Sequence, residues 1–376
     1  MYRKFRETHL FSFLHRFDDQ TQPLDCALSD YLRAHKSIGA HDRRDLGECA
    51  YALMRWKELL DHVLGKESSS WEDRYDLWRR LDRDQLPLDL PLWVRSGGSQ
   101  WLFQELSRTH GDEKAFALCR LLNEPAPLTV RANLLKTTRE QLFASWEKTY
   151  PVEPCSMAKA GIRFQQRIAL TQFPEFKQGL FEIQDEGSQI VADLVRPKIG
   201  DQILDYCSGS GGKTLAIAAN MAGRGQIYLH DIRPNILHEA RRRLRRAGVQ
   251  NAQFLPPNHP RLTSLKNQID WVLTDVPCSG SGTYRRNPDM KWKADDAQID
   301  RLVQDQREIF SQALAYVRPG GRIVYATCSL FERENEQQAS YFLKNFPIEL
   351  SEPYLSILPT TGGPDGFFGA VFTKKI

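Results

Sequence analysis

The chain has 376 residues, which is enough for two or three domains. Hydrophobic residues make up 41% and charged residues 26%, the ordinary mix of a globular protein, and this excludes a disordered or fibrous chain. The 51 basic and 47 acidic side chains leave a net charge of +4, which permits an acidic partner such as nucleic acid without requiring one.

The composition also limits the compartment. No apolar run approaches the ~20 residues that a membrane helix needs, so we expect no membrane association. The amino end starts basic, but Glu7, His9 and His15 interrupt its apolar residues, so we expect no signal peptide. The seven cysteines are odd in number and never stand at C-x-x-C spacing, which argues against a zinc site and a disulfide framework. We therefore expect a cytoplasmic protein that holds no metal.

Residues 1–124 are predicted to form an all-α domain. Between Asp42 and Leu64 apolar residues recur at steps of three and four, the period of an amphipathic helix. Further helices are expected over residues 71–81, 101–106 and 116–122. Cys26, Cys49 and Cys119 are interpreted as small buried hydrophobes. Pro125 and Pro127 stand too close together for a helix to continue, so a boundary is predicted there.

A small α/β subdomain is predicted over residues 125–184. Residues 128–132 alternate like a strand, and Thr138 is placed to cap a helix over residues 139–150. Two more strands are expected, over residues 162–170 and 179–183.

From residue 185 to residue 376 strands and helices alternate regularly. Apolar strands end at Asp205, Asp231, Asp275 and Cys328, with helices expected over residues 214–221, 235–248 and 294–317. This pattern predicts a mostly parallel sheet with helices on both faces. Such sheets bind ligands at the carboxyl ends of their strands, where the strand order reverses.

A glycine-rich turn over residues 205–214 joins a strand to a helix. It fits neither common template, because Cys207 stands where a P-loop needs glycine and Thr214 where a dinucleotide fingerprint needs one. Asp231, twenty residues after Gly211, could accept hydrogen bonds from a ribose diol. Loop and acid together indicate an adenosine-bearing cofactor. A tight turn with a capping acid is the alternative, and a nicotinamide-dependent oxidoreductase is suggested by these two features alone.

Two cysteines follow strands in this half of the chain. Cys278 lies in a second glycine turn after Asp275, and Cys328 ends a later strand. Between them, residues 284–292 are basic and carry two aromatic side chains. A single cysteine is most often a small buried hydrophobe, but two at strand ends beside a cofactor loop favour thiol chemistry.

These motifs resemble those of a known family. D-Y-C-S-G-S-G-G-K-T at 205–214, D-V-P-C-S-G-S-G at 275–282 with R-R-N-P-D-M-K-W at 285–292, and T-C-S at 327–329 with E-N-E at 334–336 are similar to motifs of the RsmB/NOP2/Sun family. Its members are S-adenosylmethionine-dependent RNA cytosine-C5 methyltransferases. The resemblance covers residues 125–376. Residues 42–44 and 51–56 are similar to the NusB-like RNA-binding domain of the bacterial ribosomal-RNA members.

The resemblance implies a fold and a partner. We expect a Rossmann-like class I methyltransferase domain over residues 185–376, preceded by an RRM-like subdomain over 125–184 and a helical NusB-like domain over 1–124. The expected partner is RNA, and ribosomal RNA in particular, in a bacterial cytoplasm. The protein is expected to be a monomer.

The resemblance also implies roles for single residues. Cys328 would be the nucleophile that adds to C6 of cytosine, Cys278 would help to resolve the covalent intermediate, and Asp275 would hydrogen-bond the base. The implied cofactor-binding residues are Cys207, Ser208, Gly209, Ser210, Gly211, Gly212, Lys213, Asp231 and Asp275. The basic side chains that could hold the cofactor carboxylate or an RNA phosphate are Lys213, Arg285, Arg286 and Lys291. The basic run over residues 241–246 is interpreted as a solvated helix face.

The sequence departs from the family pattern around the cofactor. Ser210 replaces a proline and Gly209 an alanine, and Ile236 replaces an arginine. The acid expected near the adenine amine is absent, and Asn258 is the only nearby substitute. A non-catalytic RNA-binding protein with a degraded cofactor site is therefore the alternative to an active enzyme.

Overall fold

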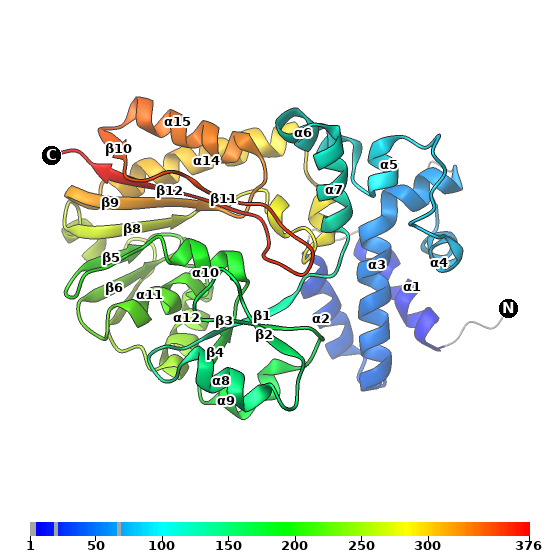
Figure 1. Ribbon diagram of the computed structural model, residues 1–376, viewed down its shortest axis with the longest axis horizontal. Helices are drawn as coiled ribbons and strands as arrows, with labels where there is room; N and C mark the ends of the chain where they lie inside the picture. The colour runs from blue at the N-terminus through cyan, green and yellow to red at the C-terminus, as the bar shows by residue number, and fades with distance from the viewer. Residues whose placement is uncertain (1–4, 19–21, 66–68) are drawn as a thin grey trace. The chain divides into compact units, whose positions relative to one another are not determined.

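The computed structural model describes residues 5–18, 22–65 and 69–376 (Figure 1), so the first four residues of the amino end considered for a signal peptide lie outside it. No helix in these ranges is long and apolar enough to cross a membrane. The chain forms two compact units, residues 1–125 with 283–296, and residues 126–282 with 297–376. The three-part division predicted from the sequence stays a proposal.

The first unit is helical, as expected. Its helices are α1 (Phe5–Asp18), α2 (Leu24–Ala34), α3 (Ala40–Leu64), α4 (Trp71–Arg80), α5 (Leu92–Ser96), α6 (Gln100–His110), α7 (Asp112–Leu122) and the 3₁₀ turn η3 (Pro288–Trp292). Apolar faces of α1 to α4 meet in one core, in which Leu14, Leu53 and Trp71 are buried. Of the three cysteines interpreted as buried hydrophobes, Cys119 is buried and Cys49 half-buried. The expectation for Cys26 is wrong, because α2 turns this residue to solvent.

The second unit begins with a small sheet. Its elements are β1 (Leu128–Ala132), α8 (Arg139–Trp146), β2 (Val152–Pro154), β3 (Gly161–Phe164), η1 (Leu170–Gln172), α9 (Pro174–Lys177) and β4 (Phe181–Ile183). The strands pair antiparallel in the order β2-β3-β1-β4, the arrangement of a ferredoxin-like β-α-β-β-α-β unit. Thr138 caps α8 in a capping box with Gln141, as predicted. The strand expected over residues 162–170 ends at Phe164, because exposed polar residues follow it.

A large sheet occupies the rest of the unit. Its elements are α10 (Glu186–Ala192), β5 (Gln202–Asp205), α11 (Gly212–Asn220), β6 (Gln226–His230), α12 (Pro234–Ala247), β7 (Ala252–Leu255), α13 (Arg261–Ser264), β8 (Ile269–Asp275), η2 (Ser281–Thr283), α14 (Asp296–Leu314), β9 (Val317–Thr327), η4 (Glu332–Glu334), α15 (Glu336–Asn345), β10 (Ile348–Leu350), β11 (Leu355–Ile357) and β12 (Phe367–Lys374). The strand order is β10-β12-β9-β8-β5-β6-β7, with β11 pairing β12. Strands β5 to β9 run parallel, and β12 is antiparallel to β9.

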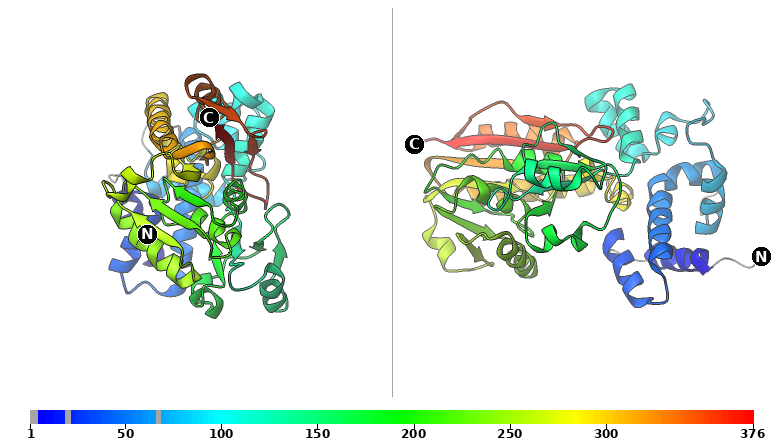
Figure 2. Two further views of the ribbon diagram at one scale, coloured as in Figure 1. Left: turned by 90° about the vertical axis from the view of Figure 1, so that its left-hand side faces the viewer. Right: turned by 60° about the horizontal axis from the view of Figure 1, so that its bottom comes forward.

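Helices cover both faces of this sheet, so alternate strand residues enter two cores (Figures 1 and 2). On β8, Val272 packs in the core that contains α14 and α15, whereas Leu273 packs in the core with α11 and α12. This three-layer arrangement confirms the predicted Rossmann-like fold. The strand order reverses between β5 and β8, so a crevice is expected beyond their carboxyl ends.

Candidate active site

A cavity of about 1090 Å³ opens at the carboxyl ends of β5, β6 and β8. Its volume suits a ligand of nucleoside size or larger. Every residue in the predicted cofactor set except Gly211 lines it, and so does Asn258. Asn258 lies in a left-handed conformation with φ of 63°. Its role in holding adenine stays a prediction.

The glycine loop approaches the cavity through backbone that other residues rarely adopt. Gly209 has φ of 51° and Gly211 has φ of 78°. Gly211 also packs closely, since a Cβ there would lie 2.9 Å from Cδ1 of Leu244 on α12. Gly211 therefore requires glycine, whereas at Gly209 a side chain would meet open space and only the positive φ favours glycine.

Asp231 connects this loop to the end of β6. Its carboxylate accepts the Gly209 N–H at 2.9 Å and the Arg233 N–H at 2.9 Å, and the Arg233 guanidinium binds it at 3.0 Å. Burial raises the pKa of Asp231, but these hydrogen bonds outweigh burial and hold the pKa below its ordinary value. The acid is thus ionised and already supports the loop, and its predicted contact with a ribose stays untested.

Two further titratable groups stand at the end of β5, Asp205, which is buried, and Cys207, which is half-buried. Asp205 accepts a hydrogen bond from Thr214 Oγ1 at 2.6 Å, and burial raises its pKa to about 7. Burial also raises the pKa of Cys207, so this thiol is not activated for attack.

Lys213, at the start of α11, is buried and bonded to Asp275 at the end of β8. Its Nζ lies 2.5 Å from Oδ2 of Asp275. Burial lowers the pKa of Lys213, but the neighbouring carboxylate outweighs burial and raises the pKa above its ordinary value. The lysine is therefore a fixed positive charge between the cofactor loop and the loop that follows β8.

The two predicted cysteines meet. The sulfur atoms of Cys278 and Cys328 lie 3.4 Å apart, and the Cys328 N–H donates to Sγ of Cys278 at 3.4 Å. The hydrogen bond to Cys328, together with burial, raises the pKa of the Cys278 thiol well above its ordinary value. The raised pKa favours the protonated thiol at Cys278, and either sulfur can be the donor in the contact between the two.

Glu334 fastens the two cysteine loops together, a role that the sequence did not reveal. Its fully buried carboxylate accepts the Ser279 N–H at 2.9 Å, the Ser279 hydroxyl at 2.5 Å and the Ser329 hydroxyl at 2.6 Å. The Gln306 amide on α14 adds a fourth hydrogen bond at 2.9 Å. Each serine directly follows one of the cysteines. The E-N-E motif was the available signal, but nothing in it indicated which donors it would meet.

Two basic side chains of the segment 285–292 are buried. Lys291 is buried, and its Nζ donates to the carbonyls of Arg55 and Gly97 at 2.9 and 3.2 Å and to Asn123 Oδ1. Arg285 is also fully buried. The prediction of a cofactor or RNA contact is wrong for Lys291, because its ammonium is bonded within the helical unit, and for Arg285 it stays a prediction.

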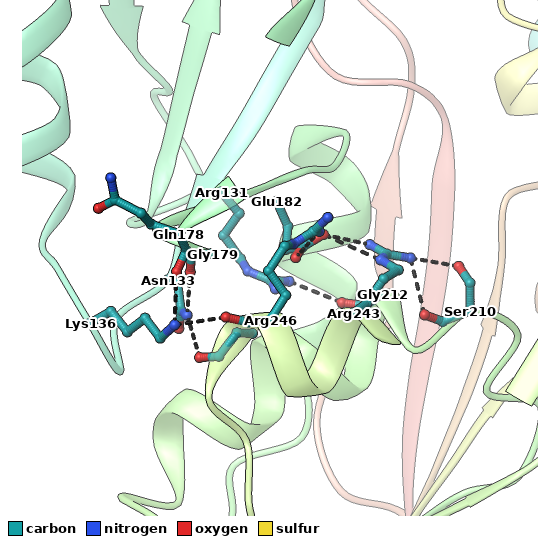
Figure 3. A network of polar contacts seen from close by, with 11 residues as sticks. Arg131, Asn133, Lys136, Gln178, Gly179, Glu182, Ser210, Gly212, Arg243 and Arg246 are labelled. Atoms are coloured by element: carbon teal, nitrogen blue, oxygen red, sulfur yellow. Dashed lines mark hydrogen bonds and ion pairs between the residues drawn. The ribbon is translucent and has the colours of Figure 1, made fainter. Parts of the chain in front are cut away.

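The basic run on α12 is only partly the solvated face that was predicted. Arg242 is exposed, but Arg243 and Arg246 both bind the buried carboxylate of Glu182 on β4 (Figure 3). For these two arginines the prediction is wrong, since the acid that pairs with them lies some sixty residues earlier in the chain. No group of three or more metal-ligating side chains gathers anywhere in the described ranges.

Comparison with known proteins gives the family. Residues 192–373 match the family model "16S rRNA methyltransferase RsmB/F", and residues 99–171 match the ferredoxin-like domain of RsmF/B-like methyltransferases. A methyltransferase homologue from Pyrococcus horikoshii has a similar structure, with a TM-score of 0.68 and 28% identity over 77% of this chain and all of that one.

Curated relatives agree. A probable ribosomal RNA small subunit methyltransferase B from Synechocystis is 32% identical over 73% of this chain and 66% of its own length. The ribosomal RNA small subunit methyltransferase B of Vibrio cholerae is 31% identical over 79% of this chain and 71% of its own length. The chain thus spans about two thirds of the length of these relatives. With both family models matched in chain order and the two motif cysteines in contact, the chain belongs to the RsmB/F family of methyltransferases.

Proposed function

We propose that this protein is an S-adenosylmethionine-dependent RNA cytosine-C5 methyltransferase that acts on ribosomal RNA in the cytoplasm. The observation that carries the proposal is the contact of Cys278 with Cys328, 3.4 Å apart, in the loops that follow the paired strands β8 and β9. A single buried cysteine would be unremarkable, but a protonated thiol directed at a second sulfur is an arrangement that supports a thiolate.

The chemistry explains why a thiolate is needed. Cytosine C5 is a weak nucleophile, and addition of the Cys328 thiolate to C6 raises the electron density at C5. S-adenosylmethionine, when bound, supplies an electrophilic methyl group. The cavity beside the glycine loop fits such a cofactor, since it has the volume, the close backbone approach and an ionised acid, Asp231, for the ribose.

Asp275 and Lys213 serve the substrate side. Lys213 occupies Oδ2 of Asp275, and no other hydrogen bond to this side chain is seen in the described part of the chain. Oδ1 is therefore available to accept from the N4 amine of a cytosine that has left its base stack. The ion pair with Lys213 holds the Asp275 carboxylate in place for this contact.

Cys278 acts when the product leaves. A hydrogen bond from its S–H stabilises the Cys328 sulfur whenever that sulfur carries negative charge, both before it attacks C6 and as the C6–S bond breaks. That bond breaks when a base removes the C5 proton, because the C–H electron pair then restores the 5,6 double bond and the thiolate leaves. Without the hydrogen bond from Cys278, the departing thiolate is less stable and the covalent intermediate persists longer.

The alternative, a non-catalytic RNA-binding protein with a degraded cofactor site, is motivated by Gly209, Ser210 and Asn258. The ordered loop and the paired cysteines favour the enzyme. Isothermal titration calorimetry with S-adenosylmethionine separates the two, because the alternative predicts no binding.

Covalent trapping tests the cysteine roles directly. Wild-type protein, Cys278→Ala and Cys328→Ala are incubated with unmodified 16S ribosomal RNA and S-adenosylmethionine, and the products are run on a denaturing gel. Cys278→Ala should accumulate a protein–RNA adduct, because it can attack C6 but releases slowly. Cys328→Ala and the double variant should show none.

Other outcomes contradict the proposal. An adduct with Cys328→Ala would mean that the two roles are reversed. Loss of stability in Cys278→Ala without any adduct would reduce Cys278 to a packing residue. Substantial methyl transfer by Cys328→Ala would remove the covalent mechanism altogether.

A further inference from the structure

An arginine outside the glycine loop is hydrogen-bonded to the residue at the middle of that loop. Nη1 of Arg243, on α12, donates to the carbonyl of Ser210 at 3.1 Å and to the Ser210 hydroxyl at 2.6 Å (Figure 3). Ser210 stands between Gly209 and Gly211, which both have positive φ. Glycines give the chain many conformations, so a loop built this way keeps one shape only if other groups fix it.

Arg243 is itself fixed by the small sheet. Its Nε and Nη2 donate to Oε2 of Glu182 at 3.2 and 3.1 Å, and Glu182 is only 3% exposed. Arg246 binds the other oxygen of the same carboxylate at 2.5 Å. Charge-assisted hydrogen bonds at both ends thus fix the guanidinium of Arg243 in one orientation.

A second arginine reaches the same loop from β1. Arg131, which is buried, donates to the carbonyl of Gly212 at 3.0 Å and to Gln184. Two carbonyls of the loop, those of Ser210 and Gly212, are therefore bonded to side chains that β1 and β4 hold in place. The ferredoxin-like sheet supports the cofactor loop through these contacts.

We propose that Arg243, oriented by Glu182, is a positioning residue for the cofactor: it keeps the glycine loop in its binding conformation before the ligand arrives. The inference rests on the proposed binding of S-adenosylmethionine at this loop. A loop that is ordered in advance loses less conformational entropy on binding, and this appears as higher affinity. Arg243 needs no contact with the cofactor to have this effect.

The chain offers a matched control. Arg246 binds the same carboxylate from the same helix, and its Cζ lies 3.9 Å from the centre of the Phe176 ring. Among the described residues it makes no hydrogen bond to the loop. Arg243→Ala and Arg246→Ala each remove one cation from Glu182, so both should lower the unfolding temperature. Only Arg243→Ala also releases Ser210.

The dissociation constant for S-adenosylmethionine is measured by calorimetry on the full chain, for wild type, both alanine variants, Ser210→Ala and the double variant Ser210→Ala/Arg243→Ala. Arg243→Ala should bind about tenfold more weakly, and Arg246→Ala within twofold of wild type. Ser210→Ala should lower the affinity for S-adenosylmethionine about threefold. Its effect and that of Arg243→Ala should not add, because both changes remove the same hydrogen bond.

Steady-state kinetics give a second readout. Arg243→Ala should raise KM for S-adenosylmethionine without a matching fall in kcat. Arg243→Lys keeps the charge for Glu182 but cannot reach both acceptors of Ser210, so it should be intermediate, and it serves if the alanine variant does not fold. Equal losses of affinity in Arg243→Ala and Arg246→Ala, or full additivity with Ser210→Ala, would overturn the inference. Failure of the wild type to bind would instead overturn the proposed function.

Discussion

Glu334 provides the sharpest test of how the cysteine pair is held. Its carboxylate accepts four hydrogen bonds of 2.5 to 2.9 Å, three of them from the two serines that follow the cysteines. Glu334→Gln keeps the shape and removes the charge, whereas Glu334→Ala removes all four acceptors. The two changes should therefore have graded effects on the loops that carry Cys278 and Cys328.

The magnitudes follow from the donors. In Glu334→Gln the amide oxygen can still accept the Ser279 N–H, and the two serine hydroxyls can rotate to accept from the amide nitrogen. The loss is then that of charge assistance, about 1–2 kcal/mol. In Glu334→Ala the buried Ser279 N–H and the Gln306 amide both lose an acceptor, and each buried donor left unsatisfied costs about 1–3 kcal/mol.

Single-turnover methyl transfer and thermal unfolding measure both effects. Each 1.4 kcal/mol that is lost from the positioning of the pair slows the chemical step about tenfold. We expect kcat to fall about tenfold in Glu334→Gln and by two to three decades in Glu334→Ala, with little change in affinity for S-adenosylmethionine, because Glu334 does not line the cavity.

Glu332 supplies the control. It lies exposed in the same 3₁₀ turn, so Glu332→Ala should leave kcat and stability unchanged. The reasoning is refuted if Glu334→Gln retains wild-type kcat, or if Glu334→Ala is destabilised but turns over normally once folded.

Two further predictions concern buried charges. Asp231→Ala should lower the affinity for S-adenosylmethionine by about one to two decades, because a hydrogen bond to a charged acceptor contributes about 1.5–3 kcal/mol. Calorimetry measures the dissociation constant, and an unchanged value would make Asp231 only a support of the loop. Burial lowers the pKa of Lys291 from 10.5 to about 7. Between these two pH values Lys291 is protonated in the unfolded chain but neutral in the folded one. The free energy of unfolding should therefore rise with pH from about 7 to 10. Lys291→Met should abolish that slope in urea titrations, and an unaltered slope would assign it to other groups.

The sequence located the groups whose position depends on strand ends. Asp205, Asp275 and Cys328 each close an apolar strand run, and parallel strands bring their carboxyl ends to one edge of a sheet. Cys278 and Cys328 are fifty residues apart in the chain, yet the pairing of β8 with β9 places their sulfurs 3.4 Å apart. Strand ends thus located these groups, and the family resemblance supplied the roles of the two cysteines.

The partners of charged side chains could not be read in the same way. The run over residues 241–246 gave no sign that Arg243 would face inward, because Glu182 lies on β4 of a different sheet. The contacts of Lys291 are with backbone carbonyls and an amide of the helical unit, and a carbonyl carries no sequence signature. The burial of these two side chains depends on long-range packing, so the sequence did not predict it.

Both glycine-rich loops of the site are held by a buried glutamate, and this choice of residue has a physical reason. A carboxylate that leaves water must be surrounded by donors, and Glu182 has two guanidinium groups while Glu334 has a backbone N–H, two hydroxyls and an amide. A carboxylate that satisfies several donors at once imposes one geometry on all of them, whereas a neutral acceptor would allow each donor a different partner. Glycine loops lack side chains that could pack, so they depend on such external restraint. Changes at the glutamates should therefore disturb the order of the loops, and kinetic constants should respond to them together with global stability.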